Sequence, residues 1–334
     1  MEMFKFTKAA DVPQAIQAAA KSSTAQQDAQ VRFIAGGTTL LDLMKLNVER
    51  PTQVVDINRL PLDQIESLAD GRLKIGALVR NSDLAHHPTV QRGYSVLSQA
   101  LLAGASAQLR NMATTGGNLL QRTRCMYFRD ETMACNKRTP GSGCSAIEGD
   151  NRSLAILGTS KDCIATNPSD MNVALTALEA TIHIQGAKGE RNVPISDFFL
   201  LPGNTPQREH VLEPGDLITY VTLPPARTNS RQVYLKLRDR ASYEFALASA
   251  AIVAEVSDGK LSYVRVALGG VGTKPWRSLE AEHTLHNRSI DENSFRRAAE
   301  AALQGAHPQS ENGFKVELAQ RCITHALTLA TKSA

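Results

Sequence analysis

The chain has 334 residues, 42% of them hydrophobic and 21% charged, which provides enough apolar surface for a core and excludes a disordered or fibrous protein. Its length predicts two or three compact units. The formal charge of +4 is spread along the chain and only 5% of residues are aromatic, so no nucleic-acid partner is expected. No apolar run reaches the roughly 18 residues of a membrane span. The N-terminal residues lack a secretion signal, so we expect any export to depend on a partner.

The first predicted elements are two strands joined by a glycine turn and a short helix. Val31–Ile34 is β-branched and aromatic, which predicts a strand that ends at Gly36 and Gly37, and leucines at helical spacing follow. A strand that passes through such a turn into a helix places backbone amides at the helix N-terminus, where they can bind a phosphate. Asp56, after the next strand, resembles the ribose-binding acid of a dinucleotide-binding fold. An ordinary β-turn stays an alternative, because the G-x-G-x-x-G pattern is absent.

The next predicted elements lead to a second glycine turn. Residues 72–79, after a turn at Asp70 and Gly71, indicate a further strand pair. Three polar residues from Asn81 onward are candidate caps of a helix, and residues 94–110 are predicted as a further helix. The sequence ATTGGN over residues 113–118 repeats the chemistry of the first turn, with two hydroxyls and two approachable glycine amides. Two such turns could hold two phosphates, whereas this turn alone would be explained by a capped helix end.

The rest of the chain alternates between patterned and unpatterned stretches. From residue 121 to 160, glycine, arginine, asparagine and serine dominate, and a structureless stretch of that length inside a compact domain is usually functional. A helix and a strand are predicted over residues 171–186. Two prolines at 224 and 225 indicate a domain boundary, and beyond it strands and a helix are predicted up to residue 272. The region from Asp291 to Ala330 is predicted to be helical.

Five sequence segments occur in the order and spacing of one protein family. They are AGGTTL at 35–40, ATTGGN at 113–118, TNPSD at 166–170, LEPGDLITYVTLP at 212–224 and YLKLRDRASYEFALASAA at 234–251. Over nearly its whole length the chain resembles the FAD-binding subunits of the xanthine dehydrogenase and aldehyde oxidase family, the molybdenum hydroxylases. It looks most similar to the branch of bacterial periplasmic aldehyde oxidases, whose flavin subunits also carry a cysteine-rich insert.

The resemblance implies an α+β fold. A PCMH-type FAD-binding domain of two α+β subdomains would span residues 1–226, and a CO dehydrogenase flavoprotein-like α+β domain would span residues 227–334. The residues implied to bind FAD are Ile34, Ala35, Gly36, Gly37, Thr38, Thr39, Leu40, Gly104, Ala105, Thr114, Gly117, Asn118, Asp170, Ile218 and Lys236. Asp170 would bind the adenosine side, with a helix cap as the alternative, and Ile218 would pack on the cofactor. Lys236 would lie near the flavin, with a solvated surface lysine as the alternative.

Four of the five cysteines fall within 39 residues, in an insert at about residues 121–163. They are Cys125, Cys135, Cys144 and Cys163. The C-x9-C-x8-C-x18-C spacing lacks the tight pairs of zinc ribbons and ferredoxins, so a [4Fe-4S] cluster, two disulfides and a structural zinc stay open. An excess of basic residues favours the anionic cluster, and the resemblance implies these four cysteines as its ligands. Cys322, in an apolar helical stretch, is predicted to be a core residue.

The resemblance also implies electron transfer within a larger oxidoreductase. A molybdenum-cofactor large subunit would oxidise an aldehyde, a [2Fe-2S] small subunit would relay the electrons to FAD on this chain, and this chain would pass them to a terminal acceptor. No side chain stands out as a general acid or base, so no catalytic residue is predicted. We expect a periplasmic location reached with a signal-bearing partner, and a cytoplasmic one otherwise. The alternatives are a free-standing FAD oxidase acting on a small substrate and a non-enzymatic scaffold with zinc or disulfides in the insert.

Overall fold

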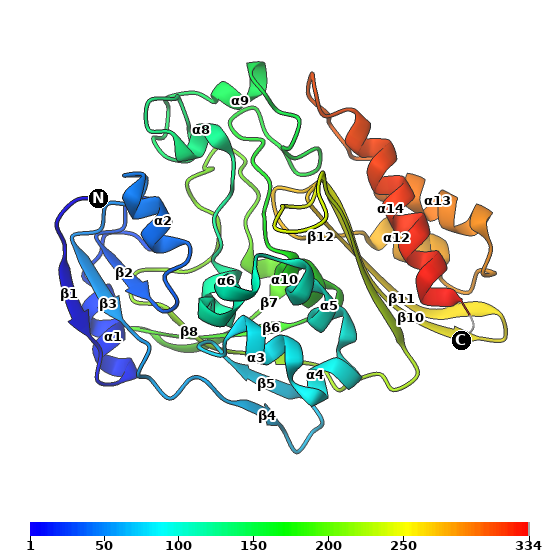
Figure 1. The fold of residues 1–334 in the computed structure, drawn as a ribbon, viewed down its shortest axis with the longest axis horizontal. Helices are drawn as coiled ribbons and strands as arrows, with labels where there is room; N and C mark the ends of the chain where they lie inside the picture. Colours follow the sequence, from blue (N-terminus) through cyan, green and yellow to red (C-terminus); the bar gives the residue numbers. More distant parts are fainter. Residues whose placement is uncertain (333–334) are drawn as a thin grey trace.

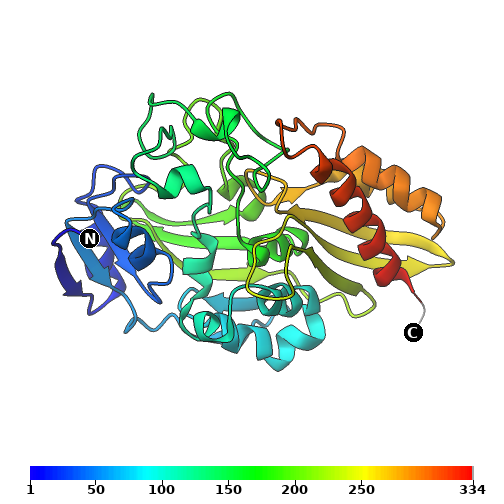
Figure 2. The ribbon, with the colours of Figure 1, turned by 45° about the horizontal axis from the view of Figure 1, so that its top comes forward.

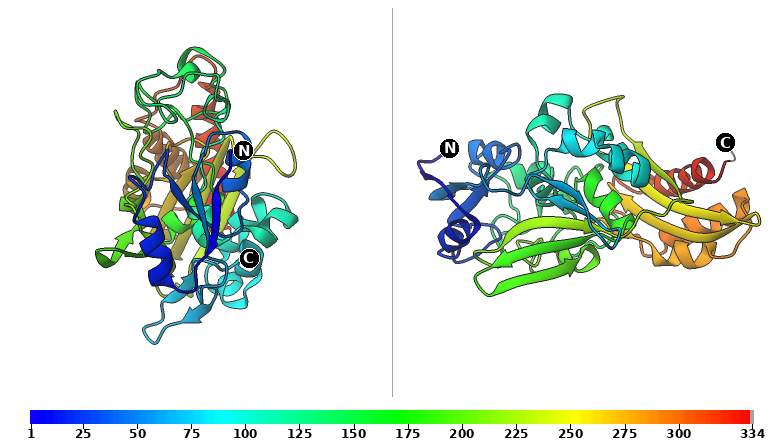
Figure 3. Two further views of the ribbon diagram at one scale, coloured as in Figure 1. Left: turned by 90° about the vertical axis from the view of Figure 1, so that its left-hand side faces the viewer. Right: turned by 90° about the horizontal axis from the view of Figure 1, so that it is seen from below.

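The computed structural model describes residues 1–332, which form three units arranged in a row (Figures 1 and 3). The N-terminal unit lies at one end of the row and the C-terminal helix at the other. Residues 121–163, called the cysteine insert below, rise on one side of the row, between the two outer units (Figure 1).

The N-terminal unit is a parallel sheet of three strands. The strand order is β1 (Lys5–Lys8), β3 (Gln53–Asp56) and β2 (Val31–Ile34). β2 and β3 correspond to the two strands predicted for this region. Helix α1 (Val12–Ala19) begins after Asp11, whose carboxylate accepts a hydrogen bond from the Gln14 amide. Helix α2 (Leu40–Lys45) follows β2 through the first glycine turn. Because β2 and β3 run in parallel, the turn lies at the edge where both strands end.

The central unit is an antiparallel sheet of five strands, with helices packed on it (Figure 3). The strands, in sheet order, are β4 (Ile65–Ser67), β5 (Leu73–Gly76), β8 (Leu217–Leu223), β6 (Thr181–Gly186) and β7 (Gly189–Pro194). The helices are α3 (Asn81–His86), α4 (Pro88–Gly93), α5 (Ser95–Ala103), α6 (Ala107–Met112), α7 (Thr115–Leu119), α10 (Asp170–Ala177) and α11 (Ile195–Phe198). Ile75, Ile182 and Val221 of the sheet share one core with Leu97 and Leu101 of α5.

Two helix boundaries in this unit differ from those predicted. Residues 94–110, predicted as one helix, are divided between α5 and α6, because the chain is extended at Gly104 and left-handed at Ala105, whose φ is 51°. Ser106 then caps α6 by accepting a hydrogen bond from the Leu109 amide. Helix α3 begins at Asn81 with Arg80 in the cap position, so the polar residues predicted as caps do not serve as one.

The cysteine insert has little regular structure and a small core of its own. It contains only two single-turn helices, α8 (Met126–Arg129) and α9 (Ser145–Glu148). Its core is formed by buried apolar residues such as Phe128 together with the cysteines. Arg138 is buried beneath it and donates hydrogen bonds to the carbonyls of Tyr127 and Phe128, which satisfies backbone groups that no strand or helix would pair.

The C-terminal unit is an antiparallel sheet of four strands with helices on one face (Figure 2). In sheet order the strands are β12 (Trp276–Arg277), β11 (Lys260–Gly269), β10 (Ala248–Ser257) and β9 (Arg231–Leu237). The helices are α12 (Leu279–Leu285), α13 (Glu292–Ala302) and α14 (Phe314–Thr331). None of the helices in the described residues combines the length and the apolar character that a membrane crossing requires.

One prediction for this unit is wrong, and another is confirmed with an interruption. The helix expected between residues 231 and 272 is a strand, β10, which is apolar along most of its length because both of its faces are buried. Ile252 packs in the core beneath α12–α14, and Val253 packs in the core of the central unit. The predicted C-terminal helical region is two helices, α13 and α14, separated by residues 303–313.

Candidate functional site

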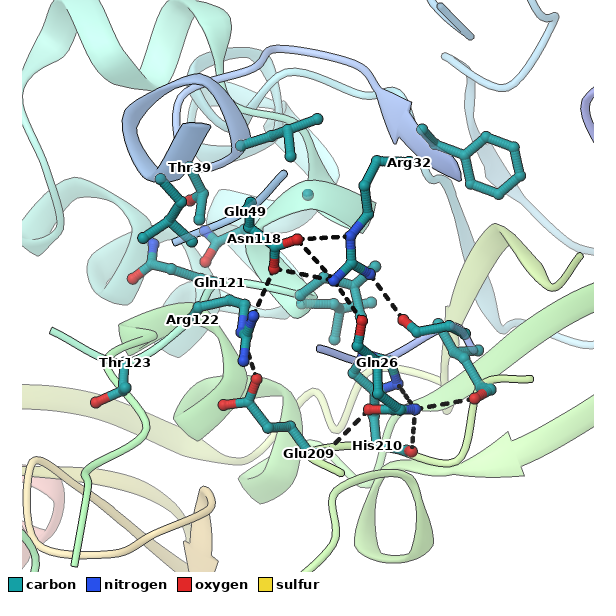
Figure 4. A pocket seen from close by; sticks show the side chains of 18 of the residues that line it. Gln26, Arg32, Thr39, Glu49, Asn118, Gln121, Arg122, Thr123, Glu209 and His210 are labelled. Atoms are coloured by element: carbon teal, nitrogen blue, oxygen red, sulfur yellow. Dashed lines mark hydrogen bonds and ion pairs between the residues drawn. The ribbon is translucent and has the colours of Figure 1, made fainter. Parts of the chain in front are cut away.

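A cleft of about 230 Å³ lies between the N-terminal and central units. One glycine turn from each unit lines it. The predicted cofactor residues in its wall are Ile34, Ala35, Gly36, Gly37, Thr38, Thr39, Leu40, Thr114, Gly117 and Asn118. The loop between α11 and β8 contributes Glu209 and His210 to the same wall (Figure 4). The structure therefore brings together ten of the fifteen residues that the sequence implied for FAD.

The first glycine turn presents free backbone amides. Among residues 1–332, no protein acceptor faces the amides of residues 36–39, and α2 begins directly after them. Gly37 has a φ of 72°, and a Cβ on Gly36 would lie 1.9 Å from the carbonyl oxygen of Met112. Glycine is thus needed for its left-handed conformation at one position and for close backbone contact at the other. Amides in this arrangement suit an anion such as a phosphate.

The second glycine turn differs, because the protein itself uses its amides. The Gly116 amide donates to a backbone carbonyl, and the Gly117 amide donates to Thr114 Oγ1 at 3.2 Å. Gly116 is buried and does not line the cleft, so the prediction of two approachable glycine amides is wrong. This turn presents side chains instead. Asn118 Oδ1 accepts a hydrogen bond from Ser169 Oγ at 2.7 Å, which leaves the side-chain nitrogen Nδ2 of Asn118 to donate to a ligand.

A partly buried ionic network forms part of the cleft wall (Figure 4). The Arg122 guanidinium pairs with the carboxylates of Glu49 and Glu209, and Arg32 lies 2.9 Å from Glu49. Lys137 Nζ lies 3.0 Å from Glu209. The five charges alternate in sign, so each carboxylate has two cationic partners. Such pairing offsets the cost of removing these groups from water.

Burial and the charges of the network together shift the pKa values of Glu209 and His210. Burial would raise the pKa of Glu209, but the charges of Arg122 and Lys137 lower it to about 2. Burial lowers the pKa of His210 to about 4, and His210 Nδ1 lies 3.1 Å from Gln26 Nε2. At neutral pH the carboxylate is therefore ionised and the imidazole is neutral.

Two buried polar atoms in the cleft wall have no hydrogen-bond partner among the described residues. They are Gln121 Oε1 and Arg122 Nη2. Buried polar groups in proteins are nearly always paired. An acceptor on a ligand would satisfy the arginine, and a donor would satisfy the glutamine.

Three predicted cofactor residues meet outside this cleft. Lys236 Nζ lies 2.8 Å from Asp170 Oδ2, and Tyr234 Oη donates to Asp170 Oδ1. A Cβ on Gly104 would lie 3.1 Å from the same carboxylate. Lys236 is thus buried and paired, and the alternative of a solvated surface lysine is wrong. Asp170 lines a second cavity of about 200 Å³, which shares residues 166–168 with the cleft.

Two other predicted residues, and one acid, line neither cavity. Ile218 is buried in the core of the central unit, and Ala105 occupies the left-handed break between α5 and α6. Asp56, compared above with a ribose-binding acid, accepts a hydrogen bond from the Asn58 amide at 2.9 Å and does not reach the cleft. The dinucleotide analogy therefore ends at the glycine turn.

All four cysteines of the insert line one small cavity of about 10 Å³. Cys135 and Cys144 face each other in an isolated antiparallel bridge. None of the five cysteines forms a disulfide in the structure, which gives no support to the disulfide alternative. Cys322 is buried in α14, as predicted.

The cysteine cavity adjoins the cleft, because Cys163 and Lys137 line both. Burial raises the pKa of Cys125 to about 12, so this thiol is neutral unless a cation binds it. Within residues 1–332, no group of three or more His, Cys, Asp or Glu side chains is arranged to hold a metal ion. The four cysteines share a cavity without ready-made ligand geometry, and the cluster stays a prediction.

Sequence reasoning missed the charged wall of the cleft. Glu49, Glu209 and His210 come from segments far apart in the chain, and no local spacing relates them. The excess of basic residues in the insert is a partial signal of this wall, because Arg122 and Lys137 pair with carboxylates of the cleft. Lys137 also lines the cysteine cavity.

The site as a whole fits an elongated ligand that carries phosphate. Free amides before a helix can bind the phosphate, and two tight glycines allow it to approach the backbone. The unpaired Gln121 Oε1 can accept a hydrogen bond and the unpaired Arg122 Nη2 can donate one, and the shared residues 166–168 connect the cleft to the cavity at Asp170. FAD has this shape and chemistry.

Comparison with known proteins agrees with this fit. Residues 2–226 match the FAD binding domain in molybdopterin dehydrogenase, and residues 233–330 match the CO dehydrogenase flavoprotein C-terminal domain. The chain is 51% identical to the aldehyde oxidoreductase FAD-binding subunit PaoB of Escherichia coli (strain K12), over 93% of this chain and 95% of that protein. It is 28% identical to the glyceraldehyde dehydrogenase medium chain of Sulfolobus acidocaldarius, over 84% of this chain and 82% of that protein.

Solved structures show the same fold. Carbon monoxide dehydrogenase from Hydrogenophaga pseudoflava matches with a TM-score of 0.77 at 24% identity, over 98% of this chain and 97% of that chain. Quinoline 2-oxidoreductase from Pseudomonas putida 86 matches with a TM-score of 0.75 at 24% identity, over 99% and 98%. The predicted fold class is confirmed. The resemblance seen in the sequence is confirmed as well, and the chain belongs to the FAD-binding subunits of the molybdenum hydroxylases, which are oxidoreductase complexes.

Proposed function

We propose that this chain is the FAD-carrying electron-transfer subunit of a heterotrimeric molybdenum-dependent aldehyde oxidoreductase. Its electrons come from a [2Fe-2S] small subunit, which receives them from a molybdenum-cofactor large subunit, and they leave to a terminal acceptor. The observation that carries the proposal is the cleft between two glycine turns, in a chain 51% identical to an aldehyde oxidoreductase FAD-binding subunit. Bound FAD supplies the redox chemistry, since its ring accepts and releases the electrons.

The protein's part is to bind and orient this cofactor. We assign the pyrophosphate to the amides of residues 36–39, because four consecutive amides there have no protein acceptor among the described residues and α2 begins directly after them. Thr114 and Asn118 contribute a hydroxyl and an amide from the facing turn. The buried Asp170–Lys236 pair lies at the second cavity, where it can orient the part of FAD that extends beyond the cleft. Gly104 lies against the Asp170 carboxylate in this region.

The finer proposal for the insert is a [4Fe-4S] cluster held by Cys125, Cys135, Cys144 and Cys163. Its support is the single cavity that all four residues line and the absence of disulfides among the five cysteines. The ammonium of Lys137 in the same wall suits an anionic, thiolate-bound cluster. A bound cluster would also complete a segment that has little apolar core of its own.

The proposed domains are residues 1–226 and 227–334, and the proposed location is the periplasm, reached with an exported partner. The location rests on the sequence resemblance to the periplasmic branch alone. A free-standing oxidase is the second candidate, because the cleft by itself does not specify where the electrons originate.

Purification through a tag on this chain, from cells that also produce its partners, tests the proposal. We expect two further subunits, a flavin spectrum and an iron–sulfur shoulder. Anaerobic addition of an aldehyde should bleach the flavin of the complex and leave the flavin of the isolated chain oxidised. Bleaching of the isolated chain would favour a free-standing oxidase, and a preparation without flavin would favour a scaffold.

A further inference from the structure

The cysteine insert forms ion pairs with α2, the helix that follows the first glycine turn. Asp42 of α2 accepts hydrogen bonds from both terminal nitrogens of Arg129, at 2.8 and 3.0 Å, and from Arg124 at 3.0 Å. These two arginines bracket Cys125, since one precedes it directly and the other closes α8. Asp42 and Arg129 line neither the FAD cleft nor the second cavity, whereas Arg124 lines the second cavity. The pair of Asp42 and Arg129 therefore joins the insert to the helix after the first glycine turn without touching the proposed ligand.

An apolar contact lies beside this ionic one. Leu43 of α2 and Val48 are 1% and 2% exposed, and both belong to the core cluster formed by the insert, with Cys125, Phe128 and Cys135 among its members. Helix α2 thus completes the small core of the insert. A segment with so few apolar residues depends on each one that it buries.

The strand that enters the turn is tied to the insert as well. Arg32 of β2 donates to both carboxylate oxygens of Glu49 at 2.9 Å, and the same carboxylate pairs with Arg122, near the start of the insert (Figure 4). The strand before the turn and the helix after it are therefore both held by one irregular segment. The geometry of the free amides at residues 36–39 depends on the positions of these two elements.

We propose that the order of the cysteine insert and the binding of FAD are linked through Asp42. An ordered insert holds α2 and β2 in the positions that aim the amides of residues 36–39 into the cleft, and bound FAD in turn stabilises the insert. Linkage of this kind is reciprocal, because each event must change the equilibrium of the other by the same factor. The inference rests on the proposed FAD site, but it holds whichever group the four cysteines bind.

Affinity for FAD measures the linkage. In the full-length chain, Cys135→Ser loosens the insert and Asp42→Ala cuts its contact with α2. We expect each substitution to raise the Kd for FAD by at least about fivefold, the lower end of ordinary coupling between sites. In the double variant the increase in the Kd for FAD should be smaller than the product of the two single increases, because a loosened insert no longer acts through Asp42. Quenching of flavin fluorescence during titration gives the four constants.

Digestion with trypsin, which cleaves after the arginines of the insert, tests whether bound FAD stabilises the insert. FAD should slow this cleavage in the wild-type chain and much less in Asp42→Ala. Glu300→Ala removes a carboxylate that is 56% exposed and paired with Arg296 on α13, and it should change neither measurement. Wild-type affinity in folded Asp42→Ala and Cys135→Ser proteins would overturn the linkage alone. A wild-type chain that binds no FAD would overturn the proposed function.

Discussion

The ammonium of Lys236 and the carboxylate of Asp170 form an ion pair at 2.8 Å, with only 4% and 10% of their side chains exposed. Lys236→Met would leave the carboxylate buried without its cation. Breaking a buried pair in this way costs about 3–5 kcal/mol, and the hydrogen bond from Tyr234 should keep the loss near the lower end. Denaturant unfolding of the FAD-free chain measures this free energy.

A second variant separates the pair from the fold around it. Asp170→Asn together with Lys236→Met removes both charges, so it should destabilise the chain by less than the sum of the two single substitutions. A loss below about 1 kcal/mol for Lys236→Met would be the value of a solvated surface pair and would contradict its burial.

Gly36→Ala should reduce FAD occupancy. The added Cβ would lie 1.9 Å from the carbonyl oxygen of Met112, so the turn must move away from the segment that leads to the second turn. That movement displaces the free amides from the cleft. We expect less FAD per folded chain, measured from the flavin released on denaturation.

Gly305→Ala is the matched control. No atom outside its chain neighbours lies within 4 Å of a Cβ at that position, so FAD content should stay at the wild-type level. Full FAD occupancy in a folded Gly36→Ala protein would show that the turn does not carry the cofactor.

Cys135→Ser should remove iron from the insert. If the four cysteines hold one [4Fe-4S] cluster, the wild-type chain contains about four irons and the variant close to none, because each thiolate is needed to hold the cluster. Cys322→Ser should retain all of the iron, since Cys322 is buried in α14 and lines none of the three cavities described above. An iron-free wild-type preparation made anaerobically with its partners would reject the cluster and leave the FAD site standing.

The glycine turns could be predicted because turn chemistry is local. Val31–Ile34, the glycine pair and the following leucines specify a strand, a turn and a helix within a dozen or so residues, and the structure has all three. The roles of the amides could not be predicted in the same way. Gly116 and Gly36 stand in similar sequences, yet only tertiary contacts decide that the Gly116 amide donates to a backbone carbonyl while the Gly36 amide stays free.

The charged residues of the cleft wall and the strand β10 could not be predicted from local sequence patterns, for a related reason. Glu49 meets Arg122 only after residues 73 positions apart are brought together, and neither has a sequence context that marks it as buried. Ile252 and Val253 face two different cores, so their strand lacks the alternation by which a half-buried strand is recognised. Family resemblance supplied what periodicity did not, as for Asp170 and Lys236, whose contact no spacing indicates.

The stability of the FAD-free chain should fall as the pH is lowered from 6.5 towards 4.5. Burial lowers the pKa of His210 from 6.5 to about 4, so in this window the unfolded chain takes up a proton that the folded chain refuses. Stability therefore decreases with acidity, by at most about 1.4 kcal/mol per pH unit for one proton, and by less if the ring is partly solvated. Glu209 contributes only at lower pH, because its stabilisation is present above its unfolded pKa of 4.5 and is lost towards its folded pKa of about 2.

His210→Asn retains a polar atom near Nδ1 for Gln26 but has no group that titrates here. Its free energy of unfolding, from denaturant curves at several pH values, should be flatter than that of the wild type between pH 6.5 and 4.5. Equal slopes for the two proteins would show that His210 is not buried in its neutral form.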